Sequence, residues 1–352
     1  MRLIAPGGHD TALATPLLAT LVTAALVELY RRAAWRLDIV DEPGGRRLHE
    51  RRTPRGGGIV ISMVYLVAAW VDGDALADGP PQAQTLAAAG MAWLGFWDDV
   101  RPAPAWLRLL VQVLVLGSAA ALWLAPSGLE VAPVWLALAV AAALFTVNAF
   151  NFIDGADGLV SLQALAVVAG LHVCLAVGGH GVDSAIAAWD GRLLLFAACL
   201  LGFLPANWPR ARLFLGDSGA YLVGTVCVGA ALQAIAEGRL QPAAAAALFV
   251  VAWVDPAWTL LRRLLRRAPL LQSHLEHGYH RLLLRRVSHI RLSAVALAYT
   301  ALWSTPIAVA LQLRAIGPAI GVALAVAPML ALVVAAGAGR PWEPESSASP
   351  SR

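Results

Sequence analysis

The chain has 352 residues, of which 59% are hydrophobic and only 14% are charged, and its mean hydropathy is +0.68. A soluble domain carries about 25% charged residues, so this composition excludes a disordered chain, a secreted disulfide scaffold and an ordinary cytosolic enzyme. The formal net charge is +4, and every one of the 26 basic residues is arginine. The composition predicts a polytopic membrane protein.

Apolar runs recur along the whole chain. A spanning helix needs roughly 20 mainly apolar residues, and eleven segments approach that length: 11–29, 56–72, 82–97, 105–125, 131–150, 158–177, 189–206, 214–236, 240–260, 293–313 and 315–338. We therefore predict an all-α integral membrane protein with about eleven transmembrane helices in one domain, residues 1–339. A disordered tail, 340–352, is expected to follow it.

The distribution of arginine predicts the orientation, because cytoplasmic loops of membrane proteins are enriched in basic residues. With the N-terminus outside, 22 of the 26 arginines fall in or beside cytoplasmic segments and 4 fall outside. The C-terminus is then cytoplasmic. The predicted cytoplasmic loops are 30–56, 98–104, 151–157, 207–217 and 261–292.

Two polar segments lie at predicted cytoplasmic boundaries in the N-terminal part of the chain. The segment DEPGGRRLHERRTPRGGGI, 41–59, carries four candidate binding residues: Arg46, Arg47, His49 and Arg55. Arginine forks match phosphate oxygens, and glycines let backbone N–H groups approach an anion; a loop that only orients the chain is the alternative. The segment GFWDDVRP, 95–102, places Asp98 beside Asp99, where two carboxylates need a nearby cation or a solvated helix end.

Two further segments carry candidate site residues near the middle of the chain. In NAFNFIDGADGL, 148–159, polar residues recur every third position: Asn148, Asn151, Asp154 and Asp157. Packing gives no reason for four such residues at the end of an apolar span. In NWPRARLFLGDSG, 207–219, Asn207 precedes Asp217 by ten residues. Since Mg²⁺ takes one or two carboxylates plus substrate phosphates, Asp217 is a candidate metal ligand, together with Asp98, Asp99 or Asp154; a plain helix N-cap is the alternative.

The last predicted cytoplasmic loop, 261–292, combines an amphipathic piece with histidines. LLRRLLRRAPLL separates leucines from arginines on a helix and predicts a segment lying in the membrane interface. HLEHGYHRLLLRR carries the candidates His274, His277 and Arg281. The three-residue spacing of its histidines allows metal binding or donation to phosphates, and we favour phosphate or sugar contact. Asp255, in the span before this loop, is expected to cap a broken helix or face the interior.

Taken in order, the motifs RRLHERRTPRGGG, GFWDDVR, NAFNFIDGADGL, NWPRARLFLGDSG and HLEHGYHRL resemble those of the bacterial polyprenyl-phosphate N-acetylhexosamine-1-phosphate transferases. That superfamily also holds the phospho-N-acetylmuramoyl-pentapeptide transferase of peptidoglycan synthesis. The resemblance implies transfer of an N-acetylhexosamine-1-phosphate from a UDP-sugar to undecaprenyl phosphate, with release of UMP. It also implies a site on the cytoplasmic face of the bacterial inner membrane.

The resemblance implies a role for individual residues. Asp217 matches the Mg²⁺ carboxylate, with Mn²⁺ as a substitute, and Asp98 matches the carboxylate held to engage or deprotonate the lipid phosphate. The other implied matches are Asp99 in the acidic pair, Asn151, Asp154 and Asp157 at the uridine nucleotide and diphosphate, Asn207 upstream of the metal ligand, and His277 at sugar and phosphate. The implied partners are UDP-N-acetylhexosamine, undecaprenyl phosphate, the bilayer and a second copy in a homodimer, with no nucleic acid.

Two departures bear on the substrate. The peptidoglycan relatives carry a lysine after the acidic pair and a compact run of histidines, whereas this chain has no lysine and spaced histidines. The pattern is more similar to the branch that starts O-antigen and related surface polysaccharides, with muramoyl-pentapeptide as the alternative substrate. A rival of another class is an anion transporter, but transporters place ionisable residues near the bilayer midplane, and the candidate carboxylates lie at predicted span ends.

Overall fold

A computed structural model describes residues 9–43, 51–71, 79–125, 133–178, 184–270, 272 and 274–341. Most of these residues are helical, and helices lie at each predicted span position. The helices are α1 (His9–Arg36), α2 (Gly58–Val71), α3 (Pro80–Val100), α4 (Ala105–Leu124), α5 (Pro133–Phe152), α6 (Leu159–Val177), α7 (Ser184–Asn207), α8 (Gly216–Ala236), α9 (Pro242–Leu248), α10 (Val250–Leu265), α11 (Gly278–Leu284), α12 (His289–Ala298), α13 (Thr305–Gln312) and α14 (Pro318–Ala336). A π-helical turn, η3 (Tyr299–Ser304), joins α12 to α13.

Within the described residues, seven helical segments are long and apolar enough to cross a membrane. An eighth qualifies if α9 and α10, which are bent by 79° at their junction, form one span. Helix α2 and the stretch Gly191–Asn207 of α7 are apolar but shorter. The structure therefore confirms an all-α polytopic membrane protein, whereas the number of eleven spans and the orientation remain predictions.

Helix α8 forms the centre of the bundle. It packs against α2, α3, α4, α5 and α6, and 83% of its most apolar stretch is buried. Its N-terminal end approaches α2 so closely that a Cβ on Gly58 would lie 2.1 Å from the backbone nitrogen of Gly219. Only glycine permits such an approach of two backbones, so these residues fix the position of the start of α8.

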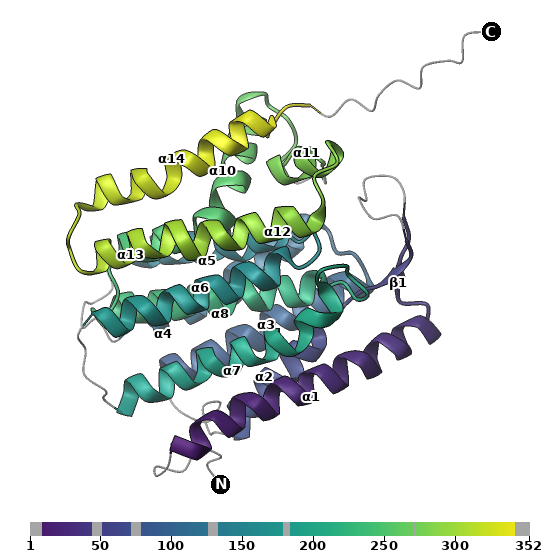
Figure 1. Cartoon of the computed structure of the whole chain (residues 1–352), viewed down its shortest axis with the longest axis horizontal. Helices are drawn as coiled ribbons and strands as arrows, with labels where there is room; N and C mark the ends of the chain where they lie inside the picture. Colours follow the sequence, from purple (N-terminus) through teal and green to yellow (C-terminus); the bar gives the residue numbers. More distant parts are fainter. Residues whose placement is uncertain are drawn as a thin grey trace.

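Segments far apart in sequence converge at one end of the bundle, where β1 (Val40–Asp41) and α11 lie (Figure 1). The short strand β1 pairs antiparallel with β2 (Thr53–Pro54), with Val40 opposite Pro54. The segment after β2 is joined to the segment before α8, because Gly57 N donates to Phe214 O at 2.9 Å and Phe214 N donates to Pro54 O at 2.8 Å. These bonds hold the entrances of α2 and α8 together.

Asp255 supports this end of the bundle from α10. Its carboxylate accepts hydrogen bonds from the backbone nitrogens of Gly278 at 2.8 Å and Tyr279 at 3.0 Å. Asp255 is buried, in agreement with the expectation that it faces the interior. The helix that it caps is α11, and the break in the helix before it lies at Phe249, between α9 and α10. The sequence does not predict this contact, because α11 lies 23 residues further along the chain.

The amphipathic stretch predicted for the membrane interface lies at the end of α10. Leu264 and Leu265 are exposed, while Arg263 is buried. Contact of this stretch with the interface remains a prediction. At the start of the predicted tail, the carbonyl groups of Arg340 and Pro341 accept hydrogen bonds from Arg281 at 2.6 and 2.8 Å, and residues 342–352 lie outside the described part.

Candidate functional site

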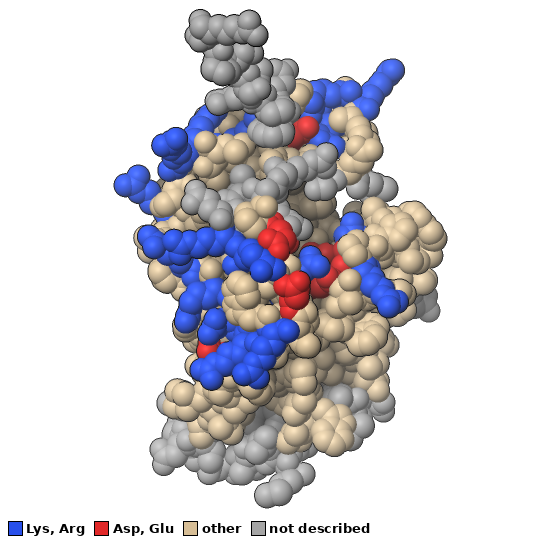
Figure 2. Space-filling view, turned by 90° about the vertical axis from the view of Figure 1, so that its right-hand side faces the viewer, with Lys and Arg blue, Asp and Glu red and all other residues tan. Residues whose placement is uncertain are grey.

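A cavity of about 260 Å³ opens at the end of the bundle where the starts of α2 and α8 meet the turn after α5. Its polar and aromatic lining consists of five aspartates, one arginine, two histidines, one asparagine and one phenylalanine: Asp41, Arg55, Asp99, Asp154, Asp157, Asn207, Phe214, Asp217, His280 and His289. Figure 2 shows this end of the molecule, with carboxylates gathered in the middle of the face and arginines around them. The site is therefore acidic at its centre and basic at its rim.

Asp99 closes the N-terminus of α8 from the end of α3. Its two carboxylate oxygens accept hydrogen bonds from the backbone nitrogens of Asp217 and Ser218, each at 3.2 Å. These N–H groups have no partner within their own helix, and the positive end of the helix dipole favours a carboxylate there. Gly216 has a φ of +76°, and a Cβ at this position would lie 2.8 Å from an Asp99 oxygen, so the cap requires glycine.

Asp98 does not line the cavity, although it is the neighbour of Asp99. Its side chain is buried, accepts a hydrogen bond from Ala103 N at 2.7 Å and forms an ion pair with Arg108 of α4. The guanidinium of Arg108 also lies 3.8 Å from an Asp217 oxygen, and the Asp98 and Asp217 side chains are hydrogen-bonded to each other. Two carboxyl groups in contact need a shared proton or a nearby cation, so Asp98, Asp217 and Arg108 form one charge cluster.

The turn after α5 supplies two further carboxylates. The carboxylate of Asp154 accepts a hydrogen bond from the backbone of Gly216. Burial, together with the nearby charges of Asp99 and Asp157, raises the pKa of Asp154 well above its usual range. Asp157 contacts the loop before α8, where its Oδ2 accepts a hydrogen bond from Ala211 N at 3.0 Å.

The three candidate asparagines have separate positions. Asn207 is buried and lines the cavity, where its Nδ2 donates to Leu213 O at 3.1 Å and so shapes the loop before α8. Asn148 donates to Gln112 Oε1 at 2.7 Å, between α5 and α4, and does not line the cavity. Asn151 lies in the last turn of α5 and is also outside the lining.

Of the histidines in the last predicted loop, some line the cavity and others do not. His277 is buried and does not line the cavity; its ring stacks on those of Phe152 and His274, with 5.5 and 4.9 Å between ring centroids. Burial and the neighbouring His277 lower the pKa of His274 to about 4. His280 does line the cavity, and burial lowers its pKa to about 3, which keeps its ring neutral near pH 7.

The structure thus brings together part of the predicted site. Six predicted residues line the cavity: Arg55, Asp99, Asp154, Asp157, Asn207 and Asp217. Asp98, Asn148, Asn151, His274, His277 and Arg281 lie outside its lining, and Arg46, Arg47 and His49 fall outside the described residues. The roles assigned to these residues remain predictions.

Sequence reasoning missed Arg108 and His289 as site residues. The side chain of Arg108 reaches Asp98 because Pro102 and Pro104 end α3 and α4 then starts at Ala105, so the two helices form a hairpin. These two prolines were the signal that could have indicated the pair. His289 lies 132 residues from its partner Asp157, and no spacing in the sequence indicates that contact.

The fold and the cavity define a polytopic membrane protein with a carboxylate-rich site at one end of its bundle. A family described as glycosyl transferase family 4 matches residues 82–235. The chain is 30% identical to a decaprenyl-phosphate N-acetylglucosaminephosphotransferase of Mycolicibacterium smegmatis in an alignment of length 341 that covers 84% of this chain and 82% of that protein. The chain belongs to the polyprenyl-phosphate N-acetylhexosamine-1-phosphate transferases of this family, as its motifs predict.

Two further relatives show the breadth of the similarity. A protein of Streptomyces coelicolor described as a glycosyltransferase is 35% identical over 283 residues, which cover 78% of this chain and 64% of the relative. This chain therefore spans a little less than two thirds of that relative. A phospho-N-acetylmuramoyl-pentapeptide-transferase of a Synechococcus strain is 36% identical over 171 residues, 44% of each chain.

Proposed function

We propose that the protein transfers an N-acetylhexosamine-1-phosphate from a UDP-sugar to undecaprenyl phosphate or another polyprenyl phosphate. An oxygen of the lipid phosphate attacks the β-phosphorus of the UDP-sugar. The bond from that phosphorus to the oxygen bridging to the α-phosphate breaks, and this oxygen leaves as part of UMP. The observation that supports the proposal is the convergence of Asp99, Asp154 and Asp217 in one cavity with Arg55.

UDP-N-acetylglucosamine is the proposed donor to test first. The Mycolicibacterium relative, which is similar over 84% of this chain, is named for N-acetylglucosamine phosphate transfer. The similarity to the muramoyl-pentapeptide enzyme covers 44% of the chain. UDP-N-acetylglucosamine would give a lipid-linked sugar that starts a surface polysaccharide or another cell-envelope glycan, and the muramoyl-pentapeptide donor is the alternative.

The donor set of the cavity fits Mg²⁺ bound together with a diphosphate. Among the described residues no three His, Cys, Asp or Glu side chains form a metal cage by themselves. Mg²⁺ instead takes one or two carboxylates and completes its coordination with phosphate oxygens and water, and Asp217 with Asp99 or Asp154 would supply those carboxylates. When bound, Mg²⁺ would neutralise negative charge on the diphosphate.

The protein's own residues contribute by positioning and by charge. Arg55 lines the cavity, and its Nε is buried without a hydrogen-bond partner among the described residues, so its guanidinium is available to a phosphate. Arg108 neutralises Asp98 and leaves Asp217 facing the cavity. A strong base is unnecessary, because a phosphate monoester with a second pKa of about 6 is largely dianionic at neutral pH. Asp98 would then orient the other groups, and rate enhancement would come from positioning and electrostatic stabilisation.

The membrane placement proposed here is the bacterial inner membrane, with eleven spans and the cavity on the cytoplasmic side. The arginine asymmetry of the sequence supports this orientation. Asp98, Asp99 and Asp217 lie at the ends of α3 and α8, which argues against a transporter with ionisable residues at the midplane.

The test is UMP release by the purified protein in detergent with undecaprenyl phosphate and Mg²⁺, using each UDP-N-acetylhexosamine in turn. We expect release that requires the lipid and the metal, that persists partly with Mn²⁺, and that is abolished in Asp217→Asn. Asp38→Asn is the matched control, because Asp38 is 80% exposed and pairs with Arg52 outside the cavity. Absence of UMP with every donor, from protein that melts cooperatively, would contradict the proposed function.

A further inference from the structure

His289 is a cavity residue that the proposed mechanism does not use. It is the first residue of α12, whose N-terminus is capped by Ser288 through a hydrogen bond from Arg291 N at 3.3 Å. The cap fixes the backbone at His289. Its side chain is 26% exposed, and it lines the cavity.

The hydrogen bonds of His289 determine which ring nitrogen carries the proton. The backbone N–H of Asp157 donates to Nδ1 at 3.0 Å, and the Asp157 Oδ1 atom lies 3.3 Å from the same nitrogen. A backbone N–H can only donate, so Nδ1 is the acceptor in this bond. Because Nδ1 accepts this bond, the proton of the neutral ring lies on Nε2. None of the described residues accepts a hydrogen bond from Nε2. The ring therefore offers one unused donor.

The ring is also held in place by its surroundings. Asp157 is fixed on one side by Ala211 N, which donates to its carboxylate, and on the other by Ser293 Oγ, which donates to its carbonyl oxygen at 2.7 Å. Ser293 belongs to the same helix as His289, one turn further on. The turn after α5 and the first turn of α12 are thus joined twice, and Nε2 keeps a fixed position.

This wall of the cavity differs from the wall that carries Asp99 and Asp217. The Asp99 carboxylate accepts from the backbone of Asp217 and Ser218 at the start of α8. The Asp157 carboxylate instead accepts from Ala211 in the loop before α8, and the Asp157 backbone donates to His289 at the start of α12. The wall with Asp99 and Asp217 carries the carboxylates that a diphosphate-bound cation would use. The second wall offers an imidazole N–H donor next to a carboxylate acceptor, a pattern that suits the carbonyl, N–H and hydroxyl groups of a nucleoside.

We propose that His289 donates a hydrogen bond from Nε2 to an acceptor oxygen in the uridine monophosphate half of the nucleotide-sugar donor. This inference rests on the proposed function and assigns a substrate-contacting residue to the same site. Its role is binding of the nucleotide, and it is independent of which N-acetylhexosamine the donor carries.

Two substitutions separate this contact from a structural role. Asn in place of His289 puts an amide oxygen near the position of Nδ1, so the bond from Asp157 N is kept while the Nε2 donor is lost. Gln puts an amide N–H near the position of Nε2, so the donor is restored while the bond from Asp157 is lost. His172→Asn, in α6 and outside the cavity, is the matched control.

The measurements are the Kd of UMP by titration calorimetry, the KM values of UDP-N-acetylglucosamine and undecaprenyl phosphate, and the apparent Tm. We expect His289→Asn to raise the Kd of UMP and the KM of the nucleotide sugar about 3- to 10-fold, as for loss of one neutral hydrogen bond. The KM of the lipid and the Tm should stay unchanged. His289→Gln should restore most of the affinity for UMP.

Three outcomes would overturn the inference. They are an unchanged Kd of UMP in His289→Asn, a larger loss in His289→Gln than in His289→Asn together with a lower Tm, and a change confined to the KM of the lipid. Failure of the wild-type protein to release UMP from any donor would instead refute the proposed function, and calorimetry with UMP distinguishes that case because it requires no turnover.

Discussion

At the scale of residues, the adjacent carboxylates Asp98 and Asp99 contact different parts of the protein. Consecutive residues of an α-helix point about 100° apart, so Asp99 reaches the N-terminus of α8 while Asp98 reaches Arg108 on α4. One residue holds the entrance of the central helix at the cavity, and the other places a charge cluster behind it. Substitution of either carboxylate should therefore affect different properties.

Asp99→Asn should lower the rate of UMP release roughly 10²- to 10³-fold, the range seen when one electrostatic group of a preorganised site is removed. Stability should fall by about 1–3 kcal/mol, because the amide oxygen can accept only one of the two backbone N–H groups while the amide NH2 faces the other. The measurements are turnover and chemical unfolding, with Asp38→Asn as the control. Nearly unchanged turnover in the variant would refute a role of Asp99 at the reacting phosphates.

His280 predicts a dependence of stability on pH. Burial lowers its pKa in the folded protein to about 3, whereas an unfolded chain has a histidine pKa of about 6.5. The unfolded state therefore binds the proton first, so stability is complete above about pH 6.5 and is lost as the pH falls toward 3. At pH 5 the loss from this residue should be about 2 kcal/mol.

The measurement for His280 is the apparent Tm in detergent at pH 7.5 and pH 5. The wild-type protein should melt at a lower temperature at pH 5, and His280→Asn should show a smaller difference between the two values. Part of the difference will remain, because the pKa of His274 is also lowered, to about 4. An equal difference in the wild type and the variant would contradict the neutral, buried state of His280.

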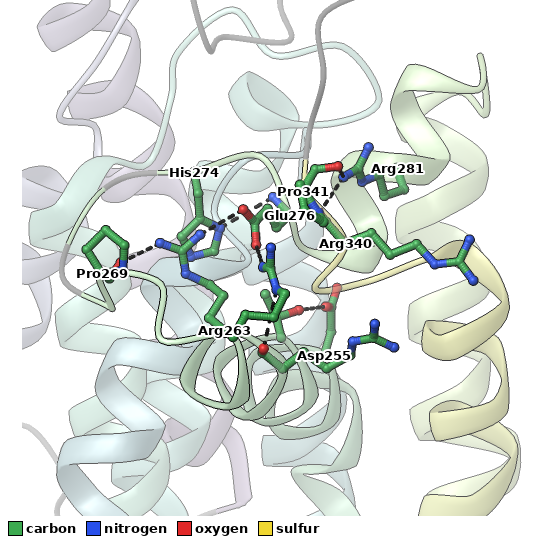
Figure 3. Close-up of polar contacts among 11 residues, drawn as sticks. Asp255, Arg263, Pro269, His274, Glu276, Arg281, Arg340 and Pro341 are labelled. Atoms are coloured by element: carbon green, nitrogen blue, oxygen red, sulfur yellow. Dashed lines mark hydrogen bonds and ion pairs between the residues drawn. The ribbon is translucent and has the colours of Figure 1, made fainter.

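At the scale of elements, a cluster of charges fixes the segment that precedes α11 (Figure 3). Glu276 forms ion pairs with Arg263 of α10 at 2.9 Å and with Arg266, directly after α10, at 2.6 Å. Its carbonyl oxygen accepts from Gly339 N at 2.7 Å, after the end of α14. Three segments therefore depend on one residue, and the next residues place Tyr279 against the turn after α5, where its hydroxyl donates to Phe152 O at 2.9 Å.

Glu276→Ala should destabilise the protein by about 3–5 kcal/mol, because it leaves the guanidinium of Arg263, which is 4% exposed, as an uncompensated buried charge. The double variant Arg263→Met with Glu276→Ala should recover much of that loss. Arg266→Ala is the matched control and should cost less than about 1 kcal/mol, because its side chain is 29% exposed. Chemical unfolding measures all three, and a double variant as unstable as Glu276→Ala would contradict the argument from buried charge.

The sequence predicts elements better than it predicts contacts between them. Apolar runs located the helices because burial in a bilayer needs a continuous apolar stretch, and the repeating Asn and Asp residues after α5 indicated a site of which Asp154 and Asp157 are part. The same pattern includes Asn148, whose amide faces Gln112 on α4 and which does not line the cavity. Neither the pairing of Arg108 with Asp98 nor that of His289 with Asp157 follows from local periodicity, because each is set by how two separate elements pack.

At the scale of the whole molecule, the predicted orientation can be tested by chemical labelling. The three native cysteines, Cys174, Cys199 and Cys227, are buried, so they should react little with a labelling reagent compared with a cysteine introduced at the surface. Arg36 is exposed at the end of α1 that the arginine distribution predicts to be cytoplasmic. Gly317 is exposed between α13 and α14 at the opposite side, and a Cβ there meets no atom within 4 Å.

Arg36→Cys and Gly317→Cys should therefore label differently with a membrane-impermeant maleimide. If the N-terminus is outside and the chain crosses the membrane eleven times, spheroplasts should label Gly317→Cys but label Arg36→Cys only after lysis. An even number of crossings between the two positions would place both cysteines on one side and give them the same labelling pattern, and a reversed orientation would exchange the two results. UMP release by each variant checks that the labelled protein is folded. Early labelling of Arg36→Cys, in either pattern, would place the cavity on the side away from the cytoplasmic nucleotide sugars that the proposed reaction requires.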